Sequence, residues 1–210
     1  MHQGSDSILS VQQLGIRRSE RWLFQNLSFE LKPGDVVQVV GQNGAGKTSL
    51  LRCLCGLLTE AEGKVSWREI DELPCLPLYI GHLPAVKSEL TVFENLKYHP
   101  IAGQFIDDVR IEDAIDEVRL GEYLETPARY LSAGQNRRVA LARLLLAETP
   151  CWVLDEPFTS LDAEGCKWLE NQIEQFSAKG GAVLVTSHQK LNLATELQFL
   201  ELHGAESASC

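Results

Sequence analysis

One short loop carries the residues best suited to hold a phosphate. It consists of Gly41, Gln42, Asn43, Gly44, Ala45, Gly46, Lys47 and Thr48, and it fits the pattern G-x-x-x-x-G-K-[ST] between an apolar run and a helical pattern of leucines. Glycines let backbone N–H groups wrap phosphate oxygens, and the start of the following helix adds a favourable dipole. Lys47 is expected to reach the β and γ phosphates, and Thr48 is expected to bind Mg²⁺. The loop therefore predicts a nucleotide site.

Two adjacent carboxylates, Asp155 and Glu156, follow a second apolar run, Cys151 to Leu154. In open α/β sheets, ligands lie at the carboxyl ends of the strands. We therefore expect Asp155 to hold the magnesium ion through water and Glu156 to polarise the attacking water. An apolar run followed by Asp-Glu is by itself more often an ordinary strand end, and it is the combination with the phosphate loop that favours the catalytic interpretation.

The segment Leu131 to Gln135 distinguishes between classes of phosphate-loop protein, because a nucleotide kinase would share the first loop. Ser132, Ala133, Gly134 and Gln135 precede a helical pattern. Ser132 and the N–H groups of a helix start suit the γ-phosphate of a nucleotide bound elsewhere. A small-residue helix cap is the simpler alternative. The sequence L-S-A-G-Q resembles the L-S-G-G-Q signature of ABC-type ATPases and differs only at Ala133.

Other segments extend the resemblance to ABC-type ATPases. Ser160-Leu-Asp162 matches the family's D-loop, and His188 matches its switch histidine. The resemblance implies that Glu156, His188 and Lys47 are catalytic, and that Asp162 belongs to the ATP site. It also implies a homodimer in which two ATP molecules lie between the phosphate loop of one copy and the Ser132 segment of the other.

Two positions depart from the family pattern. The family usually has a glutamine, in contact with Mg²⁺, after the strand that precedes its helical insertion, whereas Tyr79-Ile-Gly-His82 supplies a histidine. We hypothesise that His82 is the sensor of the metal site; the alternative is a surface loop residue. The family's adenine-stacking aromatic is also missing, and the expected region offers Arg17 and Arg18, with Trp22 the nearest aromatic. Arg18 could stack on the base through its planar guanidinium.

A narrower resemblance comes from Leu78 to Leu96, including His82, which is similar to the ATP-binding subunits of the haem exporters of cytochrome c maturation. This resemblance extends from about Ile8 to His203. It implies a peripheral subunit on the cytoplasmic face of the bacterial inner membrane, bound to an integral membrane permease. An ABC ATPase for another small substrate and a non-transport ABC ATPase remain alternatives.

The elements that must position these residues can be predicted from periodicity. We expect an antiparallel hairpin at residues 8–14 and 22–31 and buried strands at 35–40, 151–154 and 182–186. We expect helices at 47–58, 91–97 and 168–176. The expected fold is α/β, a P-loop NTPase core with a mostly parallel sheet, an N-terminal antiparallel β subdomain and an inserted α-helical subdomain. We expect a single domain over 1–210, with a flexible tail at about 1–7, a helical insertion at about 83–131 and a frayed end at about 204–210.

Composition restricts the partners. The net charge is −10, which is the wrong sign for a protein that holds nucleic acid through its phosphates, and we expect no nucleic-acid partner. No run of about 18 apolar residues is present, and we expect no membrane span. The N-terminus lacks the features of a secretory signal, which predicts a cytoplasmic protein. The six cysteines have no C-x-x-C spacing, and we expect free thiols.

Overall fold

The computed structural model describes residues 7–59, 62–70, 73–99 and 106–203 of the chain. An antiparallel sheet is formed by the first part of the chain. Its strands are β1 (Leu9–Arg18), β2 (Arg21–Leu31) and β4 (Glu62–Trp67), in the order β2-β1-β4. The predicted hairpin is confirmed, since β1 and β2 pair antiparallel. Strand β4 was not predicted, because its residues Glu-Gly-Lys-Val-Ser-Trp show almost no apolar alternation.

A five-stranded parallel sheet forms the centre of the molecule. Its strands are β3 (Val36–Val40), β7 (Leu78–Ile80), β8 (Cys151–Asp155), β9 (Ala182–Thr186) and β10 (Leu197–Glu201), in the order β10-β3-β9-β8-β7. All neighbouring strands in this sheet are parallel, so their carboxyl ends meet at one edge. Every residue of β8 and β9 is buried, as expected for parallel strands covered on both faces. A short hairpin, β5 (Glu69–Ile70) and β6 (Leu73–Pro74), lies outside both sheets.

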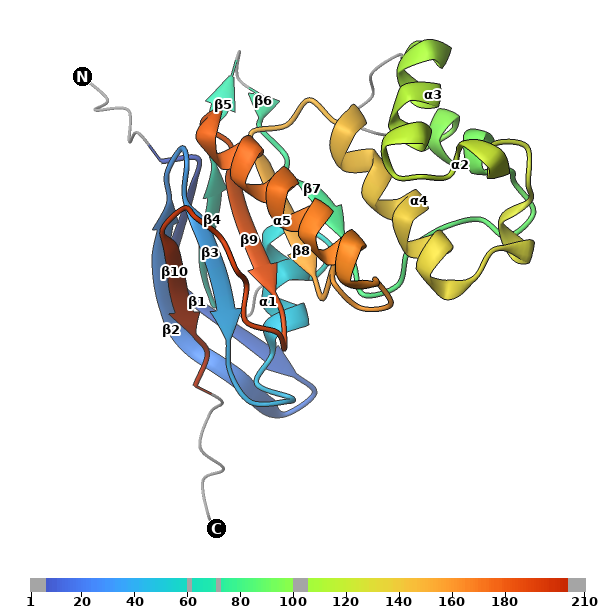
Figure 1. Cartoon of the computed structure of the whole chain (residues 1–210). Helices are drawn as coiled ribbons and strands as arrows, with labels where there is room; N and C mark the ends of the chain where they lie inside the picture. Colours follow the sequence, from blue (N-terminus) through green and yellow to red (C-terminus); the bar gives the residue numbers. More distant parts are fainter. Residues whose placement is uncertain (1–6, 60–61, 71–72, 100–105, 204–210) are drawn as a thin grey trace.

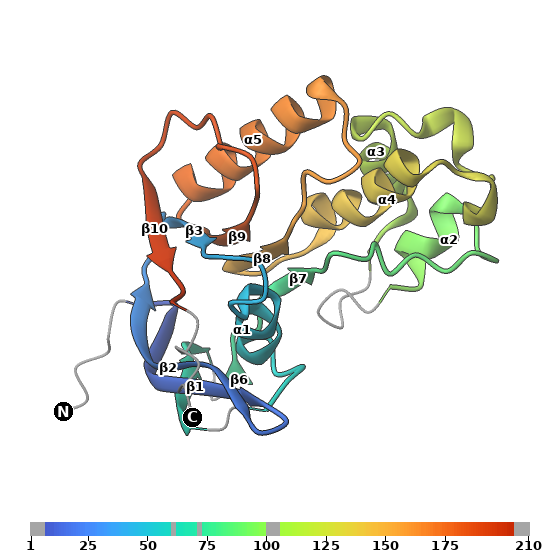
Figure 2. The same cartoon turned by 90° about the horizontal axis from the view of Figure 1, so that it is seen from below.

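Helices cover both faces of the parallel sheet. Figure 2 shows α1 (Lys47–Leu54) between the two sheets, while α5 (Ala163–Ala178) lies on the opposite face (Figure 1). The leucines of α1 pack with β1, β2 and β3, and those of α4 (Ala133–Leu146) and α5 pack on the other face. The prediction that the first helix continues to Leu58 is wrong, because the chain turns through Gly56 with φ +69° after Leu54.

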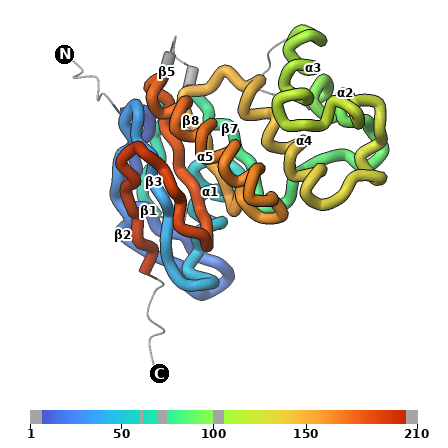
Figure 3. Tube along the Cα trace, viewed as in Figure 1, coloured from blue at the N-terminus to red at the C-terminus, as the bar shows by residue number. Residues whose placement is uncertain are grey.

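A helical region follows β7 and leads into α4. It contains α2 (Val92–Lys97), α3 (Asp108–Glu117) and two 3₁₀-helices, Gly121–Tyr123 and Ala128–Tyr130. These elements share a third hydrophobic cluster with α4, and in Figure 3 their green and yellow trace lies to one side of the sheets. The helix predicted at 91–97 is confirmed, and Thr91 and Glu94 form the expected capping box.

Several expectations concern the ends of the chain and its surface. The tails predicted at 1–7 and 204–210 lie outside the described residues, except Ser7, which is buried. Within the described part of the chain, no helix has the length and apolar character needed to cross a membrane. The five described cysteines are free thiols, and Cys210 lies outside that part.

Candidate active site

The carboxyl edge of the parallel sheet collects most of the predicted site residues. Strand β3 runs into Gly41, β7 precedes His82, and β8 and β9 end side by side, with Asp155 opposite Thr186. A cavity of about 360 Å³ opens at this edge. Its lining comprises Arg18, Leu23, Asn43, Gly44, Gly46, Lys47, Thr48, Ser49, His82, Asp155, Glu156 and His188. Residues from five separate segments of the sequence therefore face one space.

The phosphate loop is shaped as a cradle. Gly46 precedes α1 with φ +101°, a left-handed conformation that glycine adopts without strain, and no side chain caps the helix. The first N–H groups of α1 are thus left without a capping side chain, which is the arrangement that suits an anion. Lys47 Nζ donates to the carbonyl oxygens of Gly41 (2.8 Å) and Gln42 (3.2 Å), which places its charge across the loop.

Asp155 is a buried carboxylate with hydroxyl groups around it, and it is only 1% exposed. Its Oδ1 accepts hydrogen bonds from Thr48 Oγ1 (3.1 Å) and Thr186 Oγ1 (2.9 Å), and its Oδ2 lies 3.5 Å from the Tyr79 hydroxyl. Burial, and secondarily the Asp155 charge, raise the pKa of Tyr79, which stays a neutral donor.

The pair formed by Thr48 and Asp155 fits a magnesium ion. Mg²⁺ prefers oxygen ligands and usually binds through one or two side chains, phosphate oxygens and several waters. Among the described residues, no group of three or more His, Cys, Asp and Glu side chains is arranged to hold a metal alone. The ion would therefore depend on Thr48, Asp155 and a bound phosphate. His82 lines the same cavity, but its nitrogen is a poorer ligand for Mg²⁺ than an oxygen, so it would act through water.

Glu156 is held in an unusual backbone conformation, with φ +52°. Its N–H donates to Thr186 Oγ1 at 2.9 Å, so one threonine hydroxyl contacts both Asp155 and Glu156. The carboxylate Oε1 lies 3.5 Å from His188 Nε2. This arrangement can orient a water molecule between an acidic and an imidazole side chain. Thr186 was not predicted as a site residue, since the only sequence signal for it is its place at the end of the β9 apolar run.

Residues 132–135 do not line this cavity within the described part of the chain. Ser132 instead caps α4: its Oγ accepts from the Gln135 N–H (3.2 Å), and the Gln135 side chain accepts from the Ser132 N–H (2.8 Å). Two of the N–H groups predicted to contact a phosphate therefore already donate hydrogen bonds within this capping box. A Cβ on Gly134 would lie 2.8 Å from the Ser160 carbonyl oxygen, so glycine permits close packing there.

Asp162 also lies away from the cavity, as the N-cap of α5. Its carboxylate accepts from the Gly165 N–H (2.9 Å) and from Arg138 Nη2 (2.8 Å). The Gly165 hydrogen bond, together with Arg138, lowers the pKa of Asp162. The structure therefore separates the predicted residues into two groups: those at the sheet edge, and the Ser132–Gln135 and Asp162 positions outside it.

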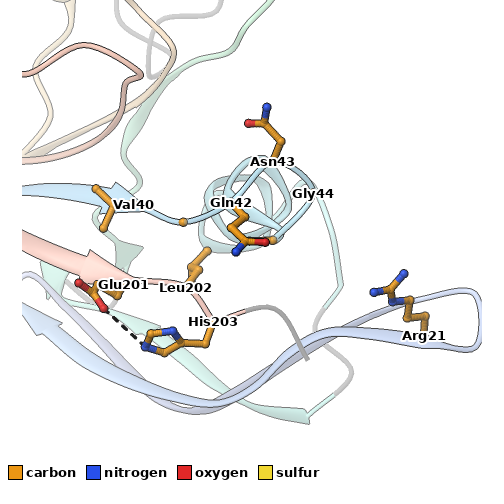
Figure 4. A pocket seen from close by; sticks show the side chains of 10 residues that line it. Arg21, Val40, Gln42, Asn43, Gly44, Glu201, Leu202 and His203 are labelled. Atoms are coloured by element: carbon orange, nitrogen blue, oxygen red, sulfur yellow. Dashed lines mark ion pairs between the residues drawn. The ribbon is translucent and has the colours of Figure 1, made fainter. Parts of the chain in front are cut away.

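A larger hollow of about 710 Å³ adjoins the phosphate loop and shares Asn43 and Gly44 with the smaller cavity. Figure 4 shows Glu201 and His203, joined by an ion pair, on one side of this hollow and Arg21 on another. Its described lining contains none of Lys47, Asp155 and Glu156, so the chemistry belongs to the smaller cavity. Arg18 lines the smaller cavity, and its neighbour Arg17 lies over the Trp22 ring at 5.8 Å.

Comparison with known proteins agrees with this arrangement. A family model described as ABC transporter matches residues 24–159, well over half of the chain. The chain belongs to the ABC transporter family. The resemblance found in the sequence is confirmed, and the ABC ATP-binding fold explains the two sheets and the helical region.

Curated relatives in the ABC family are close in length and sequence. The cytochrome c biogenesis ATP-binding export protein CcmA of Methylococcus capsulatus is 44% identical over 205 residues, covering 94% of this chain and 99% of the relative. CcmA of Yersinia pestis is 43% identical over 210 residues, covering 97% and 96%. The chain is therefore an ABC ATP-binding subunit homologous to the CcmA proteins.

Solved ABC structures match the fold. An ATP-binding subunit of an ABC transporter is 26% identical, with a TM-score of 0.77, covering 87% of this chain and 80% of that one. The dimeric ATP-binding cassette MJ0796, bound to ADP and phosphate, is 21% identical with a TM-score of 0.74, covering 86% and 88%. The predicted α/β fold class is thus confirmed.

Proposed function

We propose that this ABC subunit binds MgATP in the sheet-edge cavity and hydrolyses it to drive a membrane partner in cytochrome c biogenesis. The observation that carries the proposal is the convergence of Lys47, Thr48, Asp155, Glu156 and His188 on one cavity. A positive charge, two oxygen ligands for a metal and two groups able to handle protons are what phosphoryl transfer to water requires.

Each residue has a separate task in this proposal. The loop N–H groups and Lys47 bind the phosphates of ATP, and Thr48 and Asp155 hold Mg²⁺. When bound, Mg²⁺ neutralises charge that develops on the transferred phosphate. Glu156 accepts a hydrogen bond from the attacking water and orients it. His188, 3.5 Å from the Glu156 carboxylate, contacts the γ-phosphate and the water.

A second copy of the chain completes the site in the proposed mechanism. Ser132 to Gln135 do not line the chain's own cavity, and Ser132 is exposed. In a face-to-face dimer, the Ser132 hydroxyl proton and the first turn of α4 would meet the γ-phosphate held by the other copy. Asp162 would lie at the same contact. The MJ0796 structure, which has the same fold, is dimeric, and this supports the arrangement.

The variant Glu156→Gln tests hydrolysis and dimerisation together. Loss of the carboxylate should lower the rate of phosphate release by about 10²- to 10⁴-fold, because a positioned general base contributes on that order. The magnesium ligands remain, so ATP should stay bound and size-exclusion chromatography with ATP should show a dimer. Glu196→Gln, an exposed carboxylate outside the cavity, is the matched control. A fully active Glu156→Gln protein would contradict the assignment.

The cellular task is proposed from the CcmA relatives and from the Leu78 to Leu96 segment. ATP hydrolysis here would serve the release of a haem-loaded chaperone, with the subunit attached through a permease to the cytoplasmic face of the bacterial inner membrane. Deletion of the gene should abolish holo c-type cytochromes. Wild-type protein should restore them, and Glu156→Gln should not. Normal cytochromes in the deletion strain would instead indicate another transported substrate.

His82 is proposed as the sensor that links this cavity to the membrane partner. It is exposed and lines the cavity with Thr48 and Asp155. A neutral imidazole can donate one hydrogen bond and accept another, so it can replace a glutamine beside a metal-bound water. His82→Ala should lose stimulation of ATP hydrolysis by the partner, and His82→Gln should retain it. Full stimulation of His82→Ala would exclude this role.

A further inference from the structure

Arg137, on α4, is the most unusual buried side chain next to the site, since it is only 2% exposed. A buried cation needs compensating partners. The guanidinium finds them in five main-chain carbonyl oxygens. Nε donates to Pro157 (3.0 Å), Nη1 to Gly81 (2.8 Å) and His82 (3.5 Å), and Nη2 to Asp155 (3.3 Å) and Glu156 (2.5 Å). Every donor nitrogen of this side chain is thus committed to the polypeptide backbone.

These carbonyl groups belong to two loops that carry proposed functional side chains. One follows β7 and includes His82, and the other follows β8 and includes Glu156. A guanidinium is a flat and rigid fork, so it fixes the positions of the groups it binds relative to one another. Arg137 therefore sets the spacing between the His82 loop, the Glu156 loop and α4.

The Glu156 backbone has a particular need for such support. Positive φ is uncommon for a residue other than glycine and is maintained by its surroundings. At Glu156, with φ +52°, the N–H donates to Thr186 Oγ1 (2.9 Å), and the C=O accepts from Arg137 Nη2 (2.5 Å) and from the Thr159 N–H (3.3 Å). The Glu156 main chain is therefore held at both its N–H and its C=O, and Arg137 is the only one of these partners that lies on α4.

A second buried arginine on α4 provides an internal comparison. Arg143 is 3% exposed and donates to the carbonyl oxygens of Pro84 and Ala85, both at 2.9 Å. It therefore holds the same loop that includes His82, at a point further along. Neither of these two acceptors belongs to the Glu156 loop. The two arginines lie on the same helix and are buried to a similar extent, but of the two only Arg137 contacts the Glu156 backbone.

We propose that Arg137 is a positioning residue for ATP hydrolysis: it holds the Glu156 main chain in the conformation that aims the carboxylate at the attacking water. Ser132 is the N-cap of α4, and Arg137 lies on the same helix. A shift of α4 would therefore move Ser132 and, through Arg137, the Glu156 main chain together. The inference rests on the proposed ATPase function. It adds a residue whose guanidinium contacts neither nucleotide nor water and acts through the backbone of a residue that does.

The test compares Arg137→Lys with Arg143→Lys in the full-length chain, by kcat, KM, MgATP affinity and thermal unfolding. Lysine keeps the charge but has no planar fork. Arg137→Lys should lower kcat at least about tenfold, as a misplaced general base would, while the Kd for MgATP changes less than about threefold. Arg143→Lys should change kcat less than about threefold. An unchanged kcat in Arg137→Lys would overturn the proposal.

Combination with Glu156→Gln separates positioning from general destabilisation. If Arg137 acts through Glu156, Arg137→Lys should not lower the residual single-turnover rate of Glu156→Gln any further. A further loss equal to that seen in the wild-type background would overturn the proposal. The proposal would also be overturned if neither Arg137→Lys nor Arg137→Gln folded while Arg143→Lys did, because Arg137 would then have a structural role. Wild-type protein that releases no phosphate from MgATP contradicts the proposed function itself, which is a different outcome.

Discussion

The two segments suited to contact phosphate are built in opposite ways. The loop before α1 has no side-chain cap, places Lys47 across its own carbonyl groups and lies in a cavity in front of the buried Asp155. The segment before α4 closes on itself through the Ser132–Gln135 capping box and is exposed at Ser132. One chain thus contains a loop that lines its own cavity and, separately, a capped helix start that does not line that cavity.

This difference has energetic consequences. A capping box typically contributes about 1 kcal/mol, so the Ser132 segment keeps its conformation without nucleotide. The α1 loop has N–H groups without a capping side chain, and a ligand that binds there stabilises the folded chain in proportion to its affinity. Binding of ATP should therefore depend on Lys47 in a single chain, whereas Ser132 should become important only when two chains meet.

Lys47→Ala would test the first half of this comparison, and of the changes that test the comparison it should have the largest effect. Loss of charge-assisted hydrogen bonds worth about 1.5–3 kcal/mol should weaken MgATP binding on the order of 10- to 100-fold. Titration calorimetry on dilute protein measures it, with Lys64→Ala, an exposed lysine on β4, as the control. An unchanged Kd would show that the loop does not bind the phosphates in the way we propose.

Ser132→Asp should have a smaller effect and would test the second half. Aspartate caps helices as well as serine does, so α4 should remain intact. Its charge would face the γ-phosphate of the other chain, and we expect hydrolysis to fall about tenfold or more while ATP binding to dilute protein is unchanged. Ser132→Asn, a neutral cap, is the control for charge. Equal loss of ATP binding in both variants would refute the separation of the two segments.

The smallest of these effects concerns the helical region: the free energy of unfolding should fall at acid pH. Nucleotide binding at neutral pH should not depend on His99. His99 follows α2 and has a buried Nδ1 with no hydrogen-bond partner. Burial, followed by the charges of Arg143 and Lys87, lowers the pKa of His99 from 6.5 to about 4. The unfolded chain therefore binds this proton at higher pH than the folded chain, and stability should fall as pH drops from about 6.5 to 4.

The expected loss for this half-buried imidazole is about 1–2 kcal/mol, allowing for partial screening by solvent. Urea unfolding at several pH values measures it. His99→Gln should remove this part of the pH dependence, and His203→Gln, in which an 86% exposed side chain is replaced, should not. The same pH dependence in wild type and His99→Gln would contradict the prediction.

Features that depend on neighbouring residues could be predicted from the sequence, whereas features that depend on residues far apart in the sequence could not. The phosphate loop and the Thr91–Glu94 capping box are local, and their residue types alone indicated them. Strand β10 was not predicted, because the exposed and half-buried residues of this edge strand give no apolar run. The first helix was predicted too long, because Leu57 and Leu58 continue the leucine pattern although both are exposed.

The candidate site shows the same limit. The convergence of four residues on one cavity was predictable, since each belongs to a short motif beside an apolar run: Lys47, Thr48, Asp155 and Glu156. Thr186 could not be assigned, because its contact with Asp155 depends on the register between β8 and β9. Arg137 was visible only as a basic residue after the signature, since its carbonyl partners lie 18 to 56 residues away in the sequence.

The end of β10 sets a condition on the first glycine of the phosphate loop. A Cβ on Gly41 would lie 2.7 Å from the Leu202 carbonyl oxygen, and the Leu202 N–H donates to Val40 at 2.8 Å. The backbone after β10 therefore passes directly behind the loop. A methyl group at position 41 would push the edge strand away from β3 before it touched a nucleotide, so this glycine serves the integrity of the sheet as much as it serves the phosphates.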